Sequence, residues 1–350
     1  MFQVGLNPYG LAHTFGLQGL GTPRANPNGT GLHGFIRLAG AIGARCLEFD
    51  GRWLAPLSDD ELARLGDELP PGARLASYWL QHEPDETFAE AIRATRAIGG
   101  STIRVHLTPV LEGARARQGA RWSEMLRHAR ATLNRVARKA ADSGLVIAIE
   151  NHQDLGSGEL VAFAEEAGAN VGVALDTGNP FAVGEDPVAF AIRAGHLIRH
   201  VHLKDYVSQF TAEGFRLVRC AIGDGCVPFE EIAAALQAHT SSLTASIEVG
   251  ALDARHIRLF ASDWWDGYPM RPAGELVTAL ERLQRKRLDD NADYRTPWEK
   301  LEPDAAIMEY ELAQLHKSVE NLRALGWLGH RKTRTNTGHR KTQKNTEETE

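Results

Sequence analysis

Residues 145–151 read LVIAIEN, a run of apolar residues that ends on Glu150 and Asn151. Three further apolar segments share this pattern, namely VGVALD (171–176), IRHVHL (198–203) and TASIEV (244–249). Their near-continuous apolar character is typical of strands that are buried on both faces. The ionisable residues at or near the four ends are Glu150, Asp176, His202 and Glu248. Because a buried charge is costly unless it is paired, the pattern predicts a common site where these strands end.

The rest of the chain places these segments in a repeating fold. Four more candidate strands precede them, at 2–6, 45–50, 74–79 and 102–107. Helical patterns lie between the strands, at 58–68, 85–98, 122–141, 157–167, 186–196 and 228–239. Eight strands that alternate with helices predict a (β/α)8 TIM barrel of roughly 250 residues. The alternative, an open doubly wound sheet, requires a glycine-rich phosphate loop after an early strand, and the sequence has none.

The chain is expected to have three parts. The catalytic barrel covers 1–270, with an inserted piece at 206–226 that lengthens the last βα unit. A C-terminal helical extension covers 271–329, where GELVTALERLQRK and DAAIMEYELAQLHKSVENLRALG have helical periodicity. The tail at 330–350 is nearly free of apolar residues and is predicted to be disordered. A basic arm that binds RNA is the alternative for this tail.

Composition narrows the class of protein. The 350 residues carry a formal net charge of -6, whereas a nucleic-acid partner favours a basic protein. The three cysteines are an odd number without metal-site spacing, which indicates reduced thiols and a cytoplasmic protein. The beginning of the chain lacks the pattern of a signal peptide. No apolar run approaches the roughly 20 residues of a membrane helix, so no membrane partner is expected.

The strand-end residues predict a metal site. In a TIM barrel the active site lies at the C-terminal ends of the strands, where Glu150, Asp176, His202 and Glu248 would converge. Three carboxylates and one imidazole suit a divalent cation, with Mn²⁺, Mg²⁺ or Co²⁺ favoured by the oxygen ligands and Zn²⁺ also compatible. The alternative is a set of separate salt bridges at the barrel rim. Further polar or aromatic residues near strand ends are candidate substrate contacts, namely Glu48, His106, His152, Asn179, Lys204 and Trp265.

Five short motifs carry a family resemblance over roughly residues 1–250. These are AIEN, ALDTGN, HVHLKD, IGDG (222–225) and SIEVG. Together they resemble the xylose-isomerase-like TIM barrel superfamily, and in particular its sugar phosphate isomerase and epimerase branch. That branch includes tagatose 3-epimerase, inosose dehydratase and proteins similar to 3-oxo-isoapionate decarboxylase. The resemblance implies that Glu150, Asp176, His202 and Glu248 bind the metal, with Mn²⁺ expected. It also implies that Glu150 and Glu248 act as base and acid through a metal-stabilised enediolate.

Departures from the epimerase pattern bear on the substrate. Asn179 stands where the epimerases have a histidine, Ser208 stands where they have an arginine, and Lys204 follows His202 by two residues. We therefore expect an isomerase or epimerase of a small, unphosphorylated keto sugar or keto sugar acid, with Lys204 as a further catalytic residue. The first alternative is a lyase, a decarboxylase or dehydratase, on the same scaffold. An inactive barrel subunit of a larger assembly is an alternative of another class.

Two further expectations concern partners. Endonuclease IV, another member of the superfamily, uses three zinc ions. It requires an Asp-x-His pair before the glycine turn, and LVRCAIGDG contains no such pair. We therefore expect a small carbohydrate substrate and no nucleic acid, and a homo-oligomeric protein.

Overall fold

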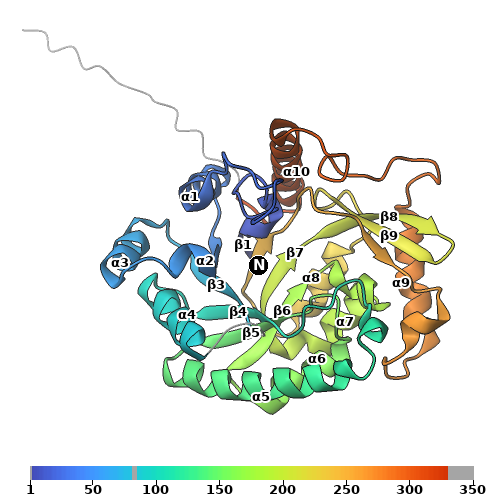
Figure 1. The fold of residues 1–350 in the computed structure, drawn as a ribbon, viewed down its shortest axis with the longest axis horizontal. Helices are drawn as coiled ribbons and strands as arrows, with labels where there is room; N and C mark the ends of the chain where they lie inside the picture. Colours follow the sequence, from blue (N-terminus) through green and yellow to red (C-terminus); the bar gives the residue numbers. More distant parts are fainter. Residues whose placement is uncertain (1, 81–84, 330–350) are drawn as a thin grey trace, which may run out of the picture.

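Eight parallel strands close into a barrel in the order β1-β10-β7-β6-β5-β4-β3-β2 (Figure 1). The computed structural model describes residues 2–80 and 85–329, so the tail predicted to be disordered lies outside the described residues. The barrel strands are β1 (Phe2–Leu6), β2 (Cys46–Asp50), β3 (Ala73–Trp79), β4 (Thr102–His106), β5 (Val146–Glu150), β6 (Val171–Asp176), β7 (Ile198–Leu203) and β10 (Leu243–Ile247). All eight strands predicted from the sequence are present, and the TIM barrel is confirmed.

Helices between the strands surround the barrel in Figure 1. They are α1 (Gly31–Ile42), α2 (Gly51–Leu54), α3 (Asp59–Glu68), α4 (Asp85–Ala97), α5 (Arg121–Asp142), α6 (Ser157–Ala167), α7 (Pro187–Ala194) and α8 (Phe229–Gln237). Short 3₁₀ turns are η1 (Pro8–Leu11), η2 (Arg115–Gln118), η3 (Asn179–Val183), η4 (Gly195–Leu197) and η5 (Ser262–Trp265). The start of α3 has a capping box, in which the Ser58 side chain accepts from the Glu61 N–H and Glu61 accepts from the Ser58 N–H.

The insertion after β7 forms two strands of a small antiparallel sheet that the sequence did not reveal. These are β8 (Asp205–Thr211) and β9 (Gly214–Cys220), and the third strand is β11 (Arg255–Ile257), which follows β10; the order is β11-β9-β8. The β8–β9 hairpin extends from the barrel beside α9 (Ala273–Arg285) in Figure 1. The Ser208 hydroxyl in β8 donates to the Leu283 carbonyl at 2.8 Å, which ties the sheet to α9.

One buried carboxylate closes the base of this hairpin. Asp205 accepts hydrogen bonds of 2.9–3.0 Å from the backbone N–H groups of Tyr206, Gly223, Gly225 and Val227. A Cβ atom at Gly225 would lie 2.3 Å from Asp205 Oδ1, so only glycine allows the backbone to approach this closely. The IGDG motif is therefore explained by the close approach of its backbone N–H groups to the Asp205 carboxylate.

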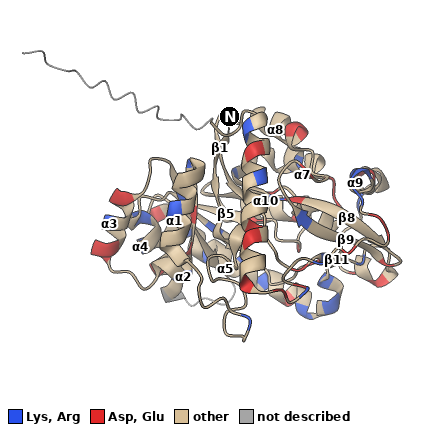
Figure 2. Cartoon of the chain, turned by 90° about the horizontal axis from the view of Figure 1, so that it is seen from above, with Lys and Arg blue, Asp and Glu red and all other residues tan. Residues whose placement is uncertain are grey.

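The second helix of the C-terminal extension packs on the beginning of the chain. It is α10 (Asp304–Ala324), and acidic and basic residues are interspersed along it (Figure 2). Its Glu311 is fully buried and accepts from the Thr14 N–H at 2.8 Å, the Thr14 hydroxyl at 2.7 Å and the His13 N–H at 3.2 Å. The extension thus fixes the loop that follows β1.

Two expectations drawn from composition can be compared with the structure. Cys46, Cys220 and Cys226 are all free thiols. Among the described residues, every helix is too short or too polar to cross a lipid bilayer.

Candidate metal centre

The four predicted ligands lie together at the C-terminal end of the barrel. Glu150 and Asp176 are the last residues of β5 and β6, His202 is the last but one of β7, and Glu248 follows β10 directly. Asp176 pairs with His202 in register. One ligand atom from each of the four residues lies within 4.8 Å of all the others, and all four residues are buried. Sequential strands have therefore delivered three carboxylates and one imidazole to one point.

The imidazole of His202 is oriented for ligation by a carboxylate behind it. Its Nε2 lies 2.8 Å from Glu48 Oε2. Its Nδ1 is fully buried, has no hydrogen-bond partner among the described residues, and lies 3.1 Å from Glu248 Oε2 and 3.5 Å from Glu150 Oε1. A histidine that ligates a metal commonly donates its other N–H to a carboxylate in this way. The orphaned nitrogen and the three carboxylates thus fit a divalent cation.

Asp176 is held in place by its own loop. Its Oδ1 accepts from the backbone N–H groups of Gly178 at 3.0 Å and Asn179 at 3.1 Å. The Asn151 side chain accepts from the Asp176 N–H at 2.6 Å and donates to the Asp176 carbonyl at 2.9 Å. The DTGN and AIEN motifs are therefore explained by mutual hydrogen bonds that align the ends of β5 and β6.

Two buried cations lie against the carboxylates. The Lys204 ammonium contacts Asp176 and lies 2.6 Å from Glu248 Oε1. The Arg104 guanidinium lies 3.1 Å from Glu150 Oε2. Burial raises the pKa of Glu150, but Arg104 and His106 outweigh this effect and hold the pKa well below 4.5. Burial also raises the pKa of Asp176, and Lys204 offsets only part of that rise.

An aromatic wall borders Glu150. His106 Nε2 lies 2.7 Å from Glu150 Oε2, and its ring stacks on His152 with centroids 3.9 Å apart. The ring of Trp79, at the end of β3, meets His106 edge-on at 4.7 Å and remains 39% exposed. This wall brings two of the predicted substrate contacts, His106 and His152, beside the ligand cluster.

The remaining predicted contacts lie in other surroundings. Asn179 donates to the Asn151 carbonyl at 2.8 Å and accepts from Gln153 at 3.0 Å, so its amide is engaged within the protein. Trp265 donates to the Leu259 carbonyl at 2.9 Å and packs against Trp264. Substrate contact by Asn179 and Trp265 stays a prediction.

Glu48 lies on the inner side of the cluster and is fully buried. Besides His202, it receives hydrogen bonds from Asn7 Nδ2 at 3.0 Å, Ser77 Oγ at 2.5 Å and Arg104 Nε at 2.9 Å. All of these contacts are with protein groups. They indicate a residue that orients His202, and its direct contact with substrate stays a prediction.

Two residues of the site were missed from the sequence. Asn7 follows β1 directly and donates to Glu48 and, at 3.3 Å, to Glu248. The strand-end pattern that identified Glu150 applies to Asn7 as well and was a usable signal. Arg104 precedes His106 by two residues on β4, so both side chains point into the barrel. That periodicity was the available signal for Arg104.

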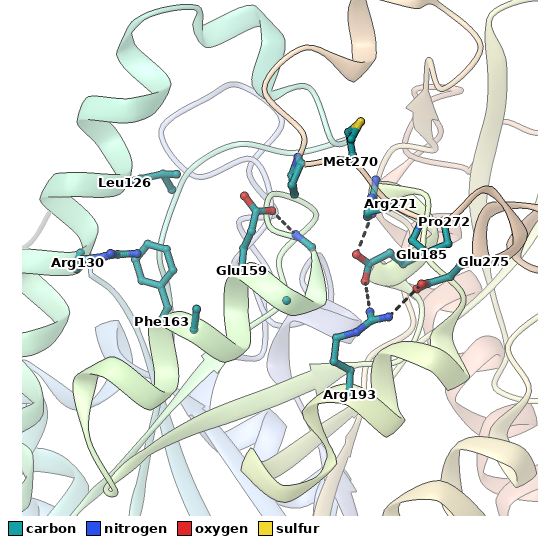
Figure 3. Close-up of a pocket in the computed structure, with 14 residues that line it drawn as sticks. Leu126, Arg130, Glu159, Phe163, Glu185, Arg193, Met270, Arg271, Pro272 and Glu275 are labelled. Atoms are coloured by element: carbon teal, nitrogen blue, oxygen red, sulfur yellow. Dashed lines mark hydrogen bonds and ion pairs between the residues drawn. The ribbon is translucent and has the colours of Figure 1, made fainter.

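A pocket of about 560 Å³ lies away from the ligand cluster, on the outer side of α6. Figure 3 shows Phe163 and Leu126 on one side and a chain of ion pairs on the other. In that chain Glu185 pairs with Arg271 at 2.8 Å, and Arg193 pairs with Glu275 at 3.1 Å. These side chains pair with one another, and the pocket contains none of the predicted catalytic residues.

Comparison with known proteins defines the family. The model of the xylose isomerase-like TIM barrel family matches residues 36–264, and the chain belongs to this family. A curated relative, the uncharacterized protein YihM of Escherichia coli (strain K12), is 28% identical over 185 residues, which are 51% of this chain and 52% of the relative. The chain thus spans about half the length of the curated relative it matches.

Solved structures share the fold at low sequence identity. L-ribulose 3-epimerase is 17% identical with a TM-score of 0.52, over 93% of this chain and 97% of that one. The IOLI protein, solved with a bound zinc atom, is 15% identical with a TM-score of 0.52, over 81% and 96%. The probable 3-DHS dehydratase AsbF of Bacillus anthracis is 14% identical with a TM-score of 0.52, over 70% and 92%. An epimerase and a probable dehydratase thus share this fold.

Proposed function

We propose that the protein is a divalent-metal-dependent isomerase or epimerase of a small keto sugar or keto sugar acid. The observation that carries the proposal is the arrangement of two carboxylates around one imidazole. Glu150 and Glu248 both approach His202 Nδ1, at 3.5 and 3.1 Å, from different strands. Each has a separate proton-bearing neighbour, His106 at 2.7 Å from Glu150 and Lys204 at 2.6 Å from Glu248.

This arrangement suits the movement of a proton at a carbon next to a carbonyl. One glutamate removes the proton, and the other returns a proton to the same or the adjacent carbon of the enediolate. The first glutamate then loses its proton to solvent and the second regains one from solvent, so no net proton is consumed. A divalent cation held by Glu150, Asp176, His202 and Glu248 would polarise the carbonyl and hydroxyl oxygens of the substrate.

A lyase is the second candidate, and Lys204 is the observation that favours it. Its ammonium is fully buried; burial lowers its pKa, but Asp176 and Glu248 outweigh burial and raise it, so the group stays charged. A charged ammonium in this position could protonate the enediolate left by loss of CO₂ from a 3-oxo sugar acid. It could equally protonate a leaving hydroxyl group in a dehydration.

The test combines metal analysis with isotope exchange. Elemental analysis of the purified full chain should find a bound divalent metal, and EDTA should abolish activity reversibly. A panel of ketoses and 3-oxo sugar acids in D₂O is then followed by NMR. Deuterium beside the carbonyl without loss of mass supports the isomerase or epimerase, whereas release of CO₂ or water supports the lyase. If the protein contains no metal and catalyses no exchange, both proposals are refuted and the inactive subunit is favoured.

Several finer properties belong to the same proposal. We propose Mn²⁺ as the metal, because oxygen ligands dominate the cluster. We also propose an unphosphorylated substrate, a cytoplasmic location, a homo-oligomer, a barrel that ends near residue 270 and a helical extension up to 329. Elemental analysis of the purified protein tests the metal directly, and light scattering tests the homo-oligomer.

A further inference from the structure

One face of the small antiparallel sheet carries two arginines and a tyrosine beside the ligand cluster. Tyr206 in β8 pairs in register with Arg219 in β9. Arg255 in β11 pairs with Leu217, two residues before Arg219 on the same strand. Residues that pair, and residues two apart on one strand, share a face of a sheet. Tyr206, Arg219 and Arg255 therefore lie together on one face.

Arg219 connects this face to the metal centre. Its guanidinium is 8% exposed, with Nη2 3.5 Å from Glu248 Oε1 and Nη1 3.0 Å from the Val249 carbonyl. The hairpin thus reaches Glu248, the last of the four predicted ligands. Any substrate whose carbon lies beside Glu248 would extend toward this arginine.

The other two groups have polar atoms without protein partners. The Arg255 side chain is partly buried and makes no ion pair or hydrogen bond with the residues that the structure describes. Burial lowers the pKa of Arg255 and the charge of Arg219 lowers it further, while Tyr206, Glu112 and Asp253 offset only part of this fall. The Tyr206 hydroxyl is fully buried and has no hydrogen-bond partner among the described residues. Two adjacent cations and an unpaired hydroxyl together suit a bound anion.

The charge balance of the centre points the same way. Four buried carboxylates contribute negative charge, namely Glu48, Glu150, Asp176 and Glu248. Three cationic side chains contact these carboxylates, namely Arg104, Lys204 and Arg219. With His202 neutral, as a metal ligand must be, these side chains carry one excess negative charge, and a divalent cation would turn this into one excess positive charge. An anionic substrate would compensate this excess.

We propose that Arg219, Arg255 and the Tyr206 hydroxyl form a subsite that binds the anionic group of the substrate, a carboxylate or a phosphate. This inference rests on the proposed function and makes its substrate a sugar acid rather than a neutral ketose, and recognition of a phosphate at this subsite would replace the unphosphorylated substrate proposed above. The subsite holds the anionic end over the β8–β9 hairpin while the reacting carbon lies between Glu150 and Glu248. Arginine suits this task because its planar N–H groups match carboxylate and phosphate oxygens.

The test measures binding with three unreactive polyols that differ in one group. Calorimetry of the Mn²⁺-loaded full chain compares D-glucitol, D-gluconate and D-glucitol 6-phosphate. We expect at least one anion to bind about tenfold more tightly than glucitol, and Arg255→Gln to remove that preference. A preference for gluconate identifies a carboxylate as the recognised group, and a preference for the phosphate ester identifies a phosphate. Tyr206→Phe should reduce the preference by a smaller factor.

Arg258→Gln is the matched control. Arg258 lies three residues after Arg255 and pairs with Glu213 at 3.0 Å on the surface, so its loss removes the same charge without touching the subsite. Equal binding of the three ligands to the wild type, or no measurable binding, would overturn the proposal. So would an Arg255→Gln variant that keeps the preference. Metal content and D₂O exchange of the same wild-type preparation test the proposed function separately, so the two failures are distinguishable.

Discussion

The two halves of the barrel contribute different kinds of residue to the same centre. The later strands β5, β6, β7 and β10 supply the four predicted ligands. The earlier strands supply groups that hold those ligands, namely Asn7 after β1, Glu48 on β2, and Arg104 and His106 on β4. The later half therefore supplies the predicted ligands, and the earlier half determines the charge around them and their orientation. The difference shows that the strand ends alone do not define the centre.

The comparison predicts the largest effect in the later half. Glu248→Gln should lower turnover by about 10³-fold or more, because it removes both a metal ligand and an acid–base group. The barrel should stay folded, since glutamine keeps the shape of the side chain. Steady-state kinetics and circular dichroism check this, with Glu281→Gln on the exposed side of α9 as a control. Normal turnover in Glu248→Gln would mean that the site is assigned wrongly.

A substitution in the earlier half should have a smaller effect on metal binding. Glu48→Gln should weaken the affinity for Mn²⁺ about 10–100-fold, because it removes the carboxylate that orients His202. Equilibrium dialysis against Mn²⁺ measures this loss. Glu68→Gln, at the exposed end of α3, is the control. An unchanged affinity in Glu48→Gln would show that the two halves are independent.

The same residue predicts a pH dependence of stability. Burial raises the pKa of Glu48, but His202 and Arg104 outweigh this effect and hold it well below 4.5. A depressed pKa stabilises the folded state above the unfolded value, and this contribution is lost as the pH falls from 4.5 toward the folded value. Below pH 4.5, the free energy of unfolding measured with urea should therefore fall more steeply for the wild type than for Glu48→Gln. Parallel pH profiles would contradict the assignment.

The smallest effect on the centre is expected outside the barrel. Glu311→Ala in α10 leaves the His13 and Thr14 N–H groups without their acceptor and should lower the free energy of unfolding by about 1–3 kcal/mol. Mn²⁺ affinity should change little, because Glu311 contacts the loop after β1 rather than a ligand. Urea titration measures the loss, and Glu309→Ala, on the exposed side of α10, is the control. Equal stability of the two variants would show that α10 does not anchor this loop.

The sequence predicted the later half better than the earlier half. The strands that end on Glu150 and Asp176 are apolar up to a polar end, so each strand and its ligand could be recognised from one local pattern. Arg104 lies inside its strand, and its partners Glu48 and Glu150 are 56 and 46 residues away in sequence, so its role depends on barrel closure.

The hairpin illustrates the same limit. Arg219 and Arg255 share a face of the sheet because β9 and β11 pair in antiparallel fashion. The two residues are 36 positions apart, and no local period of the sequence encodes this pairing. The alternation of apolar and polar residues in β8 and β9 was present in the sequence. It was interpreted only as an insertion, because the pattern lies outside the regular βα repeat. Contacts between distant segments therefore account for most of what the sequence did not predict.

The closure of the hairpin by Asp205 has a consequence for how such enzymes diversify. Because one side chain gathers the N–H groups at both ends of the insertion, the strands between can change in length and composition while β7 and α8 keep their positions. The hairpin is then an exchangeable module above a constant reaction centre. Replacement of that module would change the surroundings of the candidate metal centre while the four predicted ligands beneath it stay in place.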